Sequence, residues 1–131
     1  MDHQLTPRAG LLLAAITISA VDGDVSENEV AIINRLDGFS TSDDWNSAIS
    51  VWNDTPMEDC IGLVTNCLNT RQRRICLANL VDIAMADGAL HESENVLLRA
   101  YTEAFQMDDA EVEKIVDVIT LKNDQAGFFH S

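Results

Sequence analysis

The stretch ISAVDGDVSENEVAIINRL, residues 18–36, returns 65 residues later as IAMADGALHESENVLLRAY, residues 83–101. In both copies an apolar, helix-forming segment leads to an Asp-Gly pair, and acidic residues then open a second apolar segment. Asp22 aligns with Asp87, and Glu29 aligns with Glu94. Self-similarity of this kind predicts two related helix-turn-helix units.

Helix signals follow one another along the rest of the chain, and strand signals are scarce. We expect seven helices, over about residues 7–22, 27–36, 42–54, 56–68, 71–86 and 92–105 and from about 108 onward. No Gly/Ser-rich linker divides them. The sequence therefore predicts an all-α bundle in a single domain, residues 1–131, with its core over about 5–122 and a tail at 123–131.

Local signals add detail to this expectation. Thr6-Pro7 predicts a capped start for the first helix. The segment from Thr55 to Glu58 predicts a capping box at the start of the helix over 56–68. Trp45, Ile49 and Trp52 share one helix face and are expected to anchor the core. Periodicity also assigns a set of residues to inward faces, where we expect them to be buried together: Ile16, Ile32, Ile33, Ile83, Leu97, Leu98, Val112, Ile115 and Ile119.

The chain is strongly acidic, with 22 Asp and Glu residues against 8 Lys and Arg residues and a formal net charge of -14. Such a charge opposes binding to nucleic acid or to anionic lipid. The apolar run near the start is too short to span a bilayer and lacks the basic region of a signal peptide. Cys60, Cys67 and Cys76 form no C-x-x-C pair, so we expect reduced, mostly buried thiols in a cytoplasmic protein.

The two Asp-Gly corners admit two interpretations. As helix caps, the glycines would end one helix, and Ser26 with Glu29 would form a capping box for the next. As a calcium loop they are incomplete, because apolar residues occupy the first and third ligand positions in both copies. A looser site remains open, in which carboxylates of the two corners share one cation.

Such a site would use Asp22, Glu29, Asp87 and Glu94 as ligands, with Asp24, Glu27 and Glu92 at its rim. Carboxylate oxygens favour Ca²⁺, Mg²⁺ or Mn²⁺ over zinc. We therefore expect a divalent cation as the only cofactor, if the corners are more than caps.

The doubled pattern resembles the tellurite-resistance TerB family over about residues 5–122. The resemblance implies a helical bundle of a bacterial, cytoplasmic protein linked to tellurite or general stress resistance. It also implies a divalent-metal site at Asp22, Glu29, Asp87 and Glu94. The chain departs from a uniform repeat at Val21, where the second copy has Ala86, and at His91, where the first copy has Ser26.

The remaining motif is the basic cluster RQRR at residues 71–74. Arg71, Arg73 and Arg74 either pair with some of the many acids or form a docking patch for an acidic protein partner. The histidines show no spacing with Ser, Cys or Asp that is typical of catalysis. We therefore expect a non-enzymatic module with an unidentified protein partner and no nucleic acid, or else a pure interaction scaffold.

Overall fold

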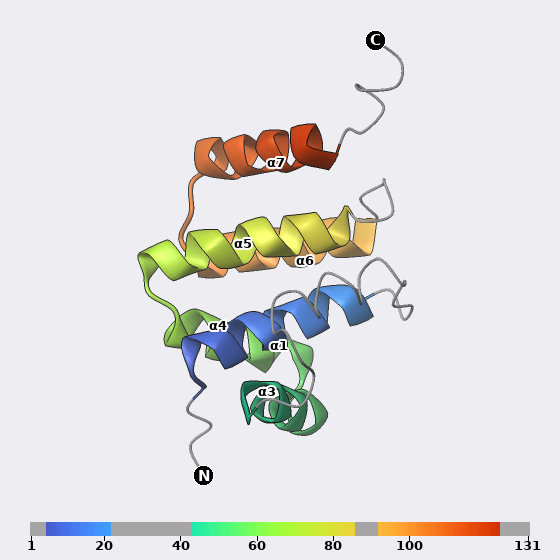
Figure 1. Ribbon diagram of the computed structural model, residues 1–131, viewed down its shortest axis with the longest axis vertical. Coiled ribbons are helices and arrows are strands. Elements are labelled where there is room, and N and C mark those ends of the chain that lie inside the picture. Colours follow the sequence, from blue (N-terminus) through green and yellow to red (C-terminus); the bar gives the residue numbers. More distant parts are fainter. Residues whose placement is uncertain (1–4, 22–42, 86–91, 124–131) are drawn as a thin grey trace.

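The protein is all-helical over residues 5–21, 43–85 and 92–123, which are the residues that the computed structural model describes (Figure 1). The predicted helix at 27–36 lies outside these residues, so the number of seven helices and their grouping into two units stay predictions. Elsewhere each helix begins within one residue of its predicted start. The helices are α1 (Pro7–Ala20), α3 (Asp43–Asp54), α4 (Met57–Cys67), α5 (Thr70–Ala84), α6 (Glu92–Ala104) and α7 (Asp109–Asn123).

The helices form a stack (Figure 1). Helix α3 lies at one end against α1 and α4, the pair α5 and α6 follows, and α7 lies at the other end. Helix α1 packs against α3, α4, α5 and α6, whereas α7 packs mainly on α5. Because apolar helices with neighbours on all sides belong in a core, the position of α1 agrees with its nearly unbroken apolar sequence.

Close contact between α1 and α4 depends on a glycine. Gly10 is buried in α1, and a Cβ atom at this position would collide with the Sγ atom of Cys67 on α4. The absence of a side chain therefore lets the two helices approach each other.

The helix starts show which local signals operate. The Oγ1 atom of Thr6 accepts a hydrogen bond from the backbone N–H of Ala9 at 3.1 Å, which confirms the predicted cap of α1. The predicted capping box at Thr55 is wrong, because α4 begins after Pro56, which adopts the extended N-cap conformation and has no hydrogen-bonding side chain. A capping box that we did not predict, Asn69 with Gln72, opens α5.

The predicted core is only partly correct. Ile83, Leu97 and Leu98 are buried as expected, and Ile32 and Ile33 lie outside the described residues. The other members of the predicted set are half-buried, namely Ile16, Val112, Ile115 and Ile119. The last three belong to α7, which among the described helices packs mainly on α5.

The tryptophans of α3 are also less buried than expected. Trp45 and Trp52 are half-buried against the edge of the core, and so is Ile49. The buried residues of α3 are the smaller Ala48 and Val51. Because α3 is an outer helix, its small residues make the close contact and its large ones cover the margin.

Candidate functional site

The end of α1, the end of α5 and the start of α6 lie on one side of the molecule (Figure 1). Helices α1, α5 and α6 are also in mutual contact. The helix end before the first corner and the two helix ends around the second corner therefore share one side (Figure 1).

Most of the predicted ligands lie in the segments between these ends. Asp22, Asp24, Glu27, Glu29 and Asp87 are outside the described residues, so the distances between their carboxylates stay a prediction. No three His, Cys, Asp or Glu side chains in segments 5–21, 43–85 and 92–123 form a group suited to a metal ion. A cation site would therefore need at least one ligand from outside these three segments, and the predicted site takes three of its four ligands from residues 22–42 and 86–91.

The two predicted site residues that the structure describes differ in burial. Glu94, in the first turn of α6, is only 2% exposed, whereas Glu92 is exposed at the start of the same helix. A carboxylate is costly to bury unless partners compensate for the lost water. Glu94 is thus buried and has an interaction within the protein, and Glu92 is exposed. Their roles as ligand and rim residue stay predictions.

A second buried carboxylate lies just before the second corner. Asp82 on α5 accepts a hydrogen bond from Nζ of Lys122 on α7 at 3.0 Å. This ion pair fastens the last turns of α7 to the end of α5. Sequence periodicity did not single out Asp82, because a lone acid on an apolar face has no local signature.

Two of the three arginines in the basic cluster at residues 71–74 bind other parts of the protein. Arg73 donates a hydrogen bond from Nη2 to the backbone oxygen of Thr65 at 2.9 Å, and thus satisfies a carbonyl at the end of α4. Arg74 forms a two-point ion pair with Glu111 on α7, with both N···O distances 3.1 Å. Arg71 is exposed. The cluster therefore connects α5 to α4 and α7. Of its three arginines, Arg71 is the one whose exposed side chain is still suited to docking a partner.

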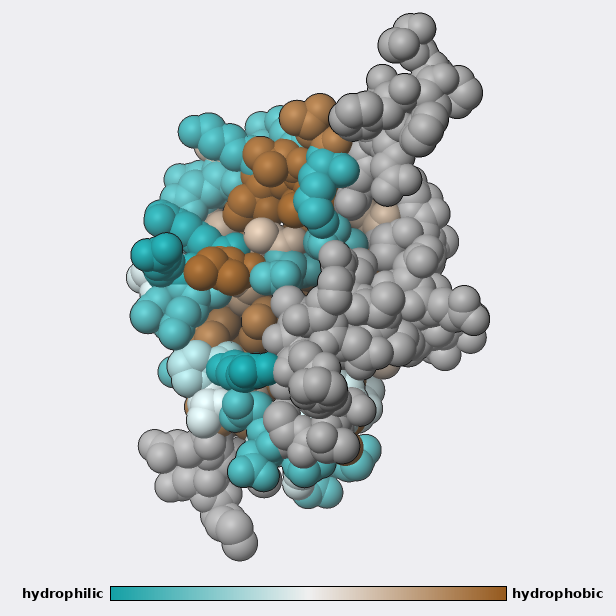
Figure 2. Space-filling view, in the orientation of Figure 1, coloured by the Kyte–Doolittle hydropathy of each residue, from teal (hydrophilic) through white to brown (hydrophobic). Residues whose placement is uncertain are grey.

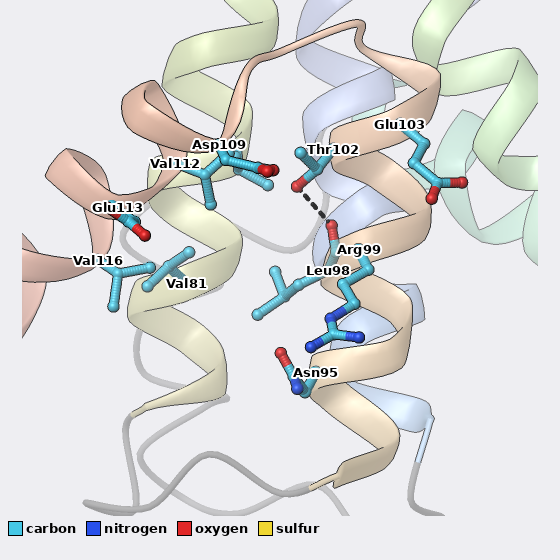
Figure 3. Close-up of a pocket in the computed structure, with 11 residues that line it drawn as sticks. Val81, Asn95, Leu98, Arg99, Thr102, Glu103, Asp109, Val112, Glu113 and Val116 are labelled. Atoms are coloured by element: carbon cyan, nitrogen blue, oxygen red, sulfur yellow. Dashed lines mark hydrogen bonds between the residues drawn. The ribbon is translucent and has the colours of Figure 1, made fainter.

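A groove opens between α6 and α7, with α5 as its floor (Figure 3). It has a volume of about 490 Å³. Leu77 and Val81 of α5 form part of its apolar lining. Figure 3 shows Asp109 reaching from the start of α7 toward Thr102 on α6. This size is within the range of ligand-binding clefts.

Helix α7 also exposes apolar side chains to solvent. On the face shown in Figure 2, hydrophobic residues gather over α7 and again over α5. Val118 and Leu121 on α7 are 62% and 76% exposed. No helix in the described part of the chain is long and apolar enough to cross a membrane.

Comparison with known families gives a match to part of the chain. Residues 53–117 match the family model described as "Tellurite resistance protein TerB". The match runs from the end of α3 into α7, and so it includes the second of the two repeated stretches. No curated protein and no solved structure matches the chain. Residues 53–117 of the chain are therefore TerB-like.

Proposed function

We propose that the chain is a non-catalytic module related to tellurite and stress resistance, and that its two acidic corners bind one divalent cation. The corners pair Asp22 with Glu29 and Asp87 with Glu94. The match of residues 53–117 to the TerB family model supports the connection with tellurite resistance. The cation site is the finer part of the proposal.

The burial of Glu94 is the observation that carries this proposal. This residue belongs to the repeated acidic pattern, yet it is only 2% exposed. A capping glutamate needs only to reach back to the helix start and can do so in water. A carboxylate turned inward at the junction of α5 and α6 is better suited to ligate a cation held between helix ends.

The chemistry of the donors sets the class of cation. A shell made of carboxylates favours the hard ions Ca²⁺, Mg²⁺ and Mn²⁺. Four carboxylates around one point would repel one another without a cation, so binding would relieve that repulsion and stabilise the ends of α1, α5 and α6. The proposed role is therefore a cation-dependent stiffening of one side of the bundle.

The alternative is a protein-interaction module in which the acidic corners only shape helix ends. The open groove between α6 and α7 favours this alternative, because it offers a partner both apolar and charged contacts. The two functions are compatible, since the groove and the corners use different residues.

Thermal unfolding with and without Ca²⁺, Mg²⁺ or Mn²⁺, at matched ionic strength, tests the cation site. A ligand that binds only the folded state at 100 times its Kd adds about 2.7 kcal/mol to the unfolding free energy. We expect this gain in the native protein and its loss in Asp22→Asn/Asp87→Asn and in Glu94→Gln. Without cations, Asp22→Asn/Asp87→Asn should be slightly more stable than the native protein.

The matched control is Glu58→Gln/Asp59→Asn, which removes two charges from exposed positions of α4. This variant should keep the full response to cations. If the native protein and the Asp22→Asn/Asp87→Asn variant gain the same stability, the added ions only screen net charge and the corners are caps.

A further inference from the structure

The groove between α6 and α7 exists because of how α7 is attached. Helix α7 packs mainly on α5 and is held there by the ion pairs of Lys122 with Asp82 and of Glu111 with Arg74. Its contact with α6 is slight. Two helices that follow each other along the chain are thus spread apart over a shared floor.

The floor and the inner walls of the groove are apolar. Val81 of α5 lies at the bottom, Leu98 faces it from α6, and Val112 and Val116 line the α7 wall (Figure 3). Leu77 of α5 also contributes to the lining. The α7 valines are half-buried, so a partner could still cover them. A stripe of this kind fits the apolar face of a helix.

The rim of the groove is acidic. Glu103, Asp109 and Glu113 are exposed around it, against a single guanidinium from Arg99. Within the described part of the chain, none of these four side chains has an ion-pair partner. The rim therefore presents a net negative charge that no ion pair within residues 5–21, 43–85 and 92–123 neutralises.

We propose that this groove binds a basic amphipathic helix of a partner protein. Helix α6 has 13 residues, so the groove offers a length of ~20 Å, or about three to four turns of a guest helix. Apolar side chains at positions i, i+4 and i+7 of the guest would lie on the floor, and its Lys or Arg side chains would face the acidic rim. A second copy of this chain would bring the same net charge of -14 and be repelled.

This inference deepens the interaction role described above and does not depend on the cation site. The test starts from a displayed library of 14-residue helical peptides, selected against the full-length protein in EDTA and at about 150 mM salt. EDTA removes any contribution of the corners, and salt screens general attraction between opposite charges. The affinity of each enriched peptide is then measured by fluorescence anisotropy.

Two groove variants and one control decide the result. Asn95→Trp places a bulky ring in the groove without changing charge, and Glu103→Gln/Glu113→Gln neutralises two rim acids. Glu58→Gln/Asp59→Asn removes the same charge from exposed positions on α4. We expect enriched peptides to be basic and amphipathic, to bind Asn95→Trp at least tenfold more weakly, and to bind the rim variant several-fold more weakly. The control should change their affinity less than twofold.

Three results would overturn the proposal: no enriched peptide, enriched peptides that tolerate Asn95→Trp, or equal losses in the two charge variants. The last would mean that peptides respond to net charge alone. Thermal unfolding of the same variants in Ca²⁺ reports separately on the cation site, so failure of one proposal is distinguishable from failure of the other.

Discussion

The hydroxyl oxygens of Thr17 on α1 and Tyr101 on α6 lie 2.7 Å apart in the core. Thr17 also donates a hydrogen bond to the backbone oxygen of Ala14 at 2.6 Å. A threonine hydroxyl has one hydrogen, so Tyr101 must be the donor in the contact between the two residues. This bond joins residues 84 positions apart and links α1 to α6 in the core.

Because Tyr101 donates and Thr17 accepts, removing the two hydroxyls should lower the unfolding free energy by different amounts. Tyr101→Phe removes the donor and leaves Thr17 bonded to Ala14, so it should cost about 0.5–1.5 kcal/mol. Thr17→Val leaves the Tyr101 hydroxyl buried without an acceptor and should cost about 1–3 kcal/mol. Urea unfolding of both variants measures the difference. Equal costs, or a larger cost for Tyr101→Phe, would show that the donor has been assigned wrongly.

Alkaline pH should destabilise the protein through two buried acids. Burial raises the pKa of the Tyr101 phenol and of the Cys76 thiol above their ordinary values of 10.0 and 9.0. Above pH 9 the unfolded chain therefore loses protons that the folded protein retains, so the unfolding free energy falls as pH rises. Each group contributes at most about 1.4 kcal/mol per pH unit.

Urea unfolding at pH 8, 9, 10 and 11 measures this slope. Cys76→Ala should flatten it from pH 9 upward, and Tyr101→Phe should flatten it only above pH 10. Slopes that match the native protein in both variants would mean that other groups cause the pH dependence.

Alanine should have opposite effects on stability at Gly10 and at Gly62, which both lie in helices that the structure describes. Gly10→Ala should cost about 1–3 kcal/mol, because its Cβ would collide with Sγ of Cys67 and force α1 and α4 apart. Gly62 on α4 is exposed and has open space around it, so Gly62→Ala should stabilise the protein by up to about 1 kcal/mol.

Thermal unfolding compares these variants with the double variant Gly10→Ala/Cys67→Ala. Removing the sulfur should restore most of the stability lost in Gly10→Ala. If it restores none, the space beside Gly10 is limited by the backbone of α4 and not by the thiol.

The two ion pairs that hold α7 should differ in strength. Asp82–Lys122 has one partly buried member, with side-chain exposures of 13% and 51%, whereas Arg74–Glu111 has exposures of 54% and 36%. Water and salt weaken exposed pairs, so we expect coupling energies of ~1 kcal/mol for the first and ~0.5 kcal/mol or less for the second. Double-mutant cycles with Asp82→Asn/Lys122→Met and Arg74→Met/Glu111→Gln measure both. A stronger Arg74–Glu111 coupling would show that two-point geometry outweighs burial.

The sequence predicted best those structural features that depend on residues close together in the chain. The cap at Thr6 followed by Pro7 was predicted correctly, and so was the start of α6 at Glu92. Asn69 and Gln72 carry the same kind of local signal and form a capping box that was not predicted. These features form from hydrogen bonds between near neighbours, so local sequence suffices to specify them.

By itself, therefore, the sequence determined that the chain is helical, that it carries a doubled acidic corner, and that it resembles the family that residues 53–117 match. Only the tertiary structure decided how deeply each helix face is buried. It also decided that Arg73 donates a hydrogen bond to the end of α4 and that a groove separates α6 from α7. Periodicity marks an apolar face but not the number of helices that will pack on it. That number depends on contacts between residues far apart in the chain, such as Asp82 with Lys122, which no local pattern records.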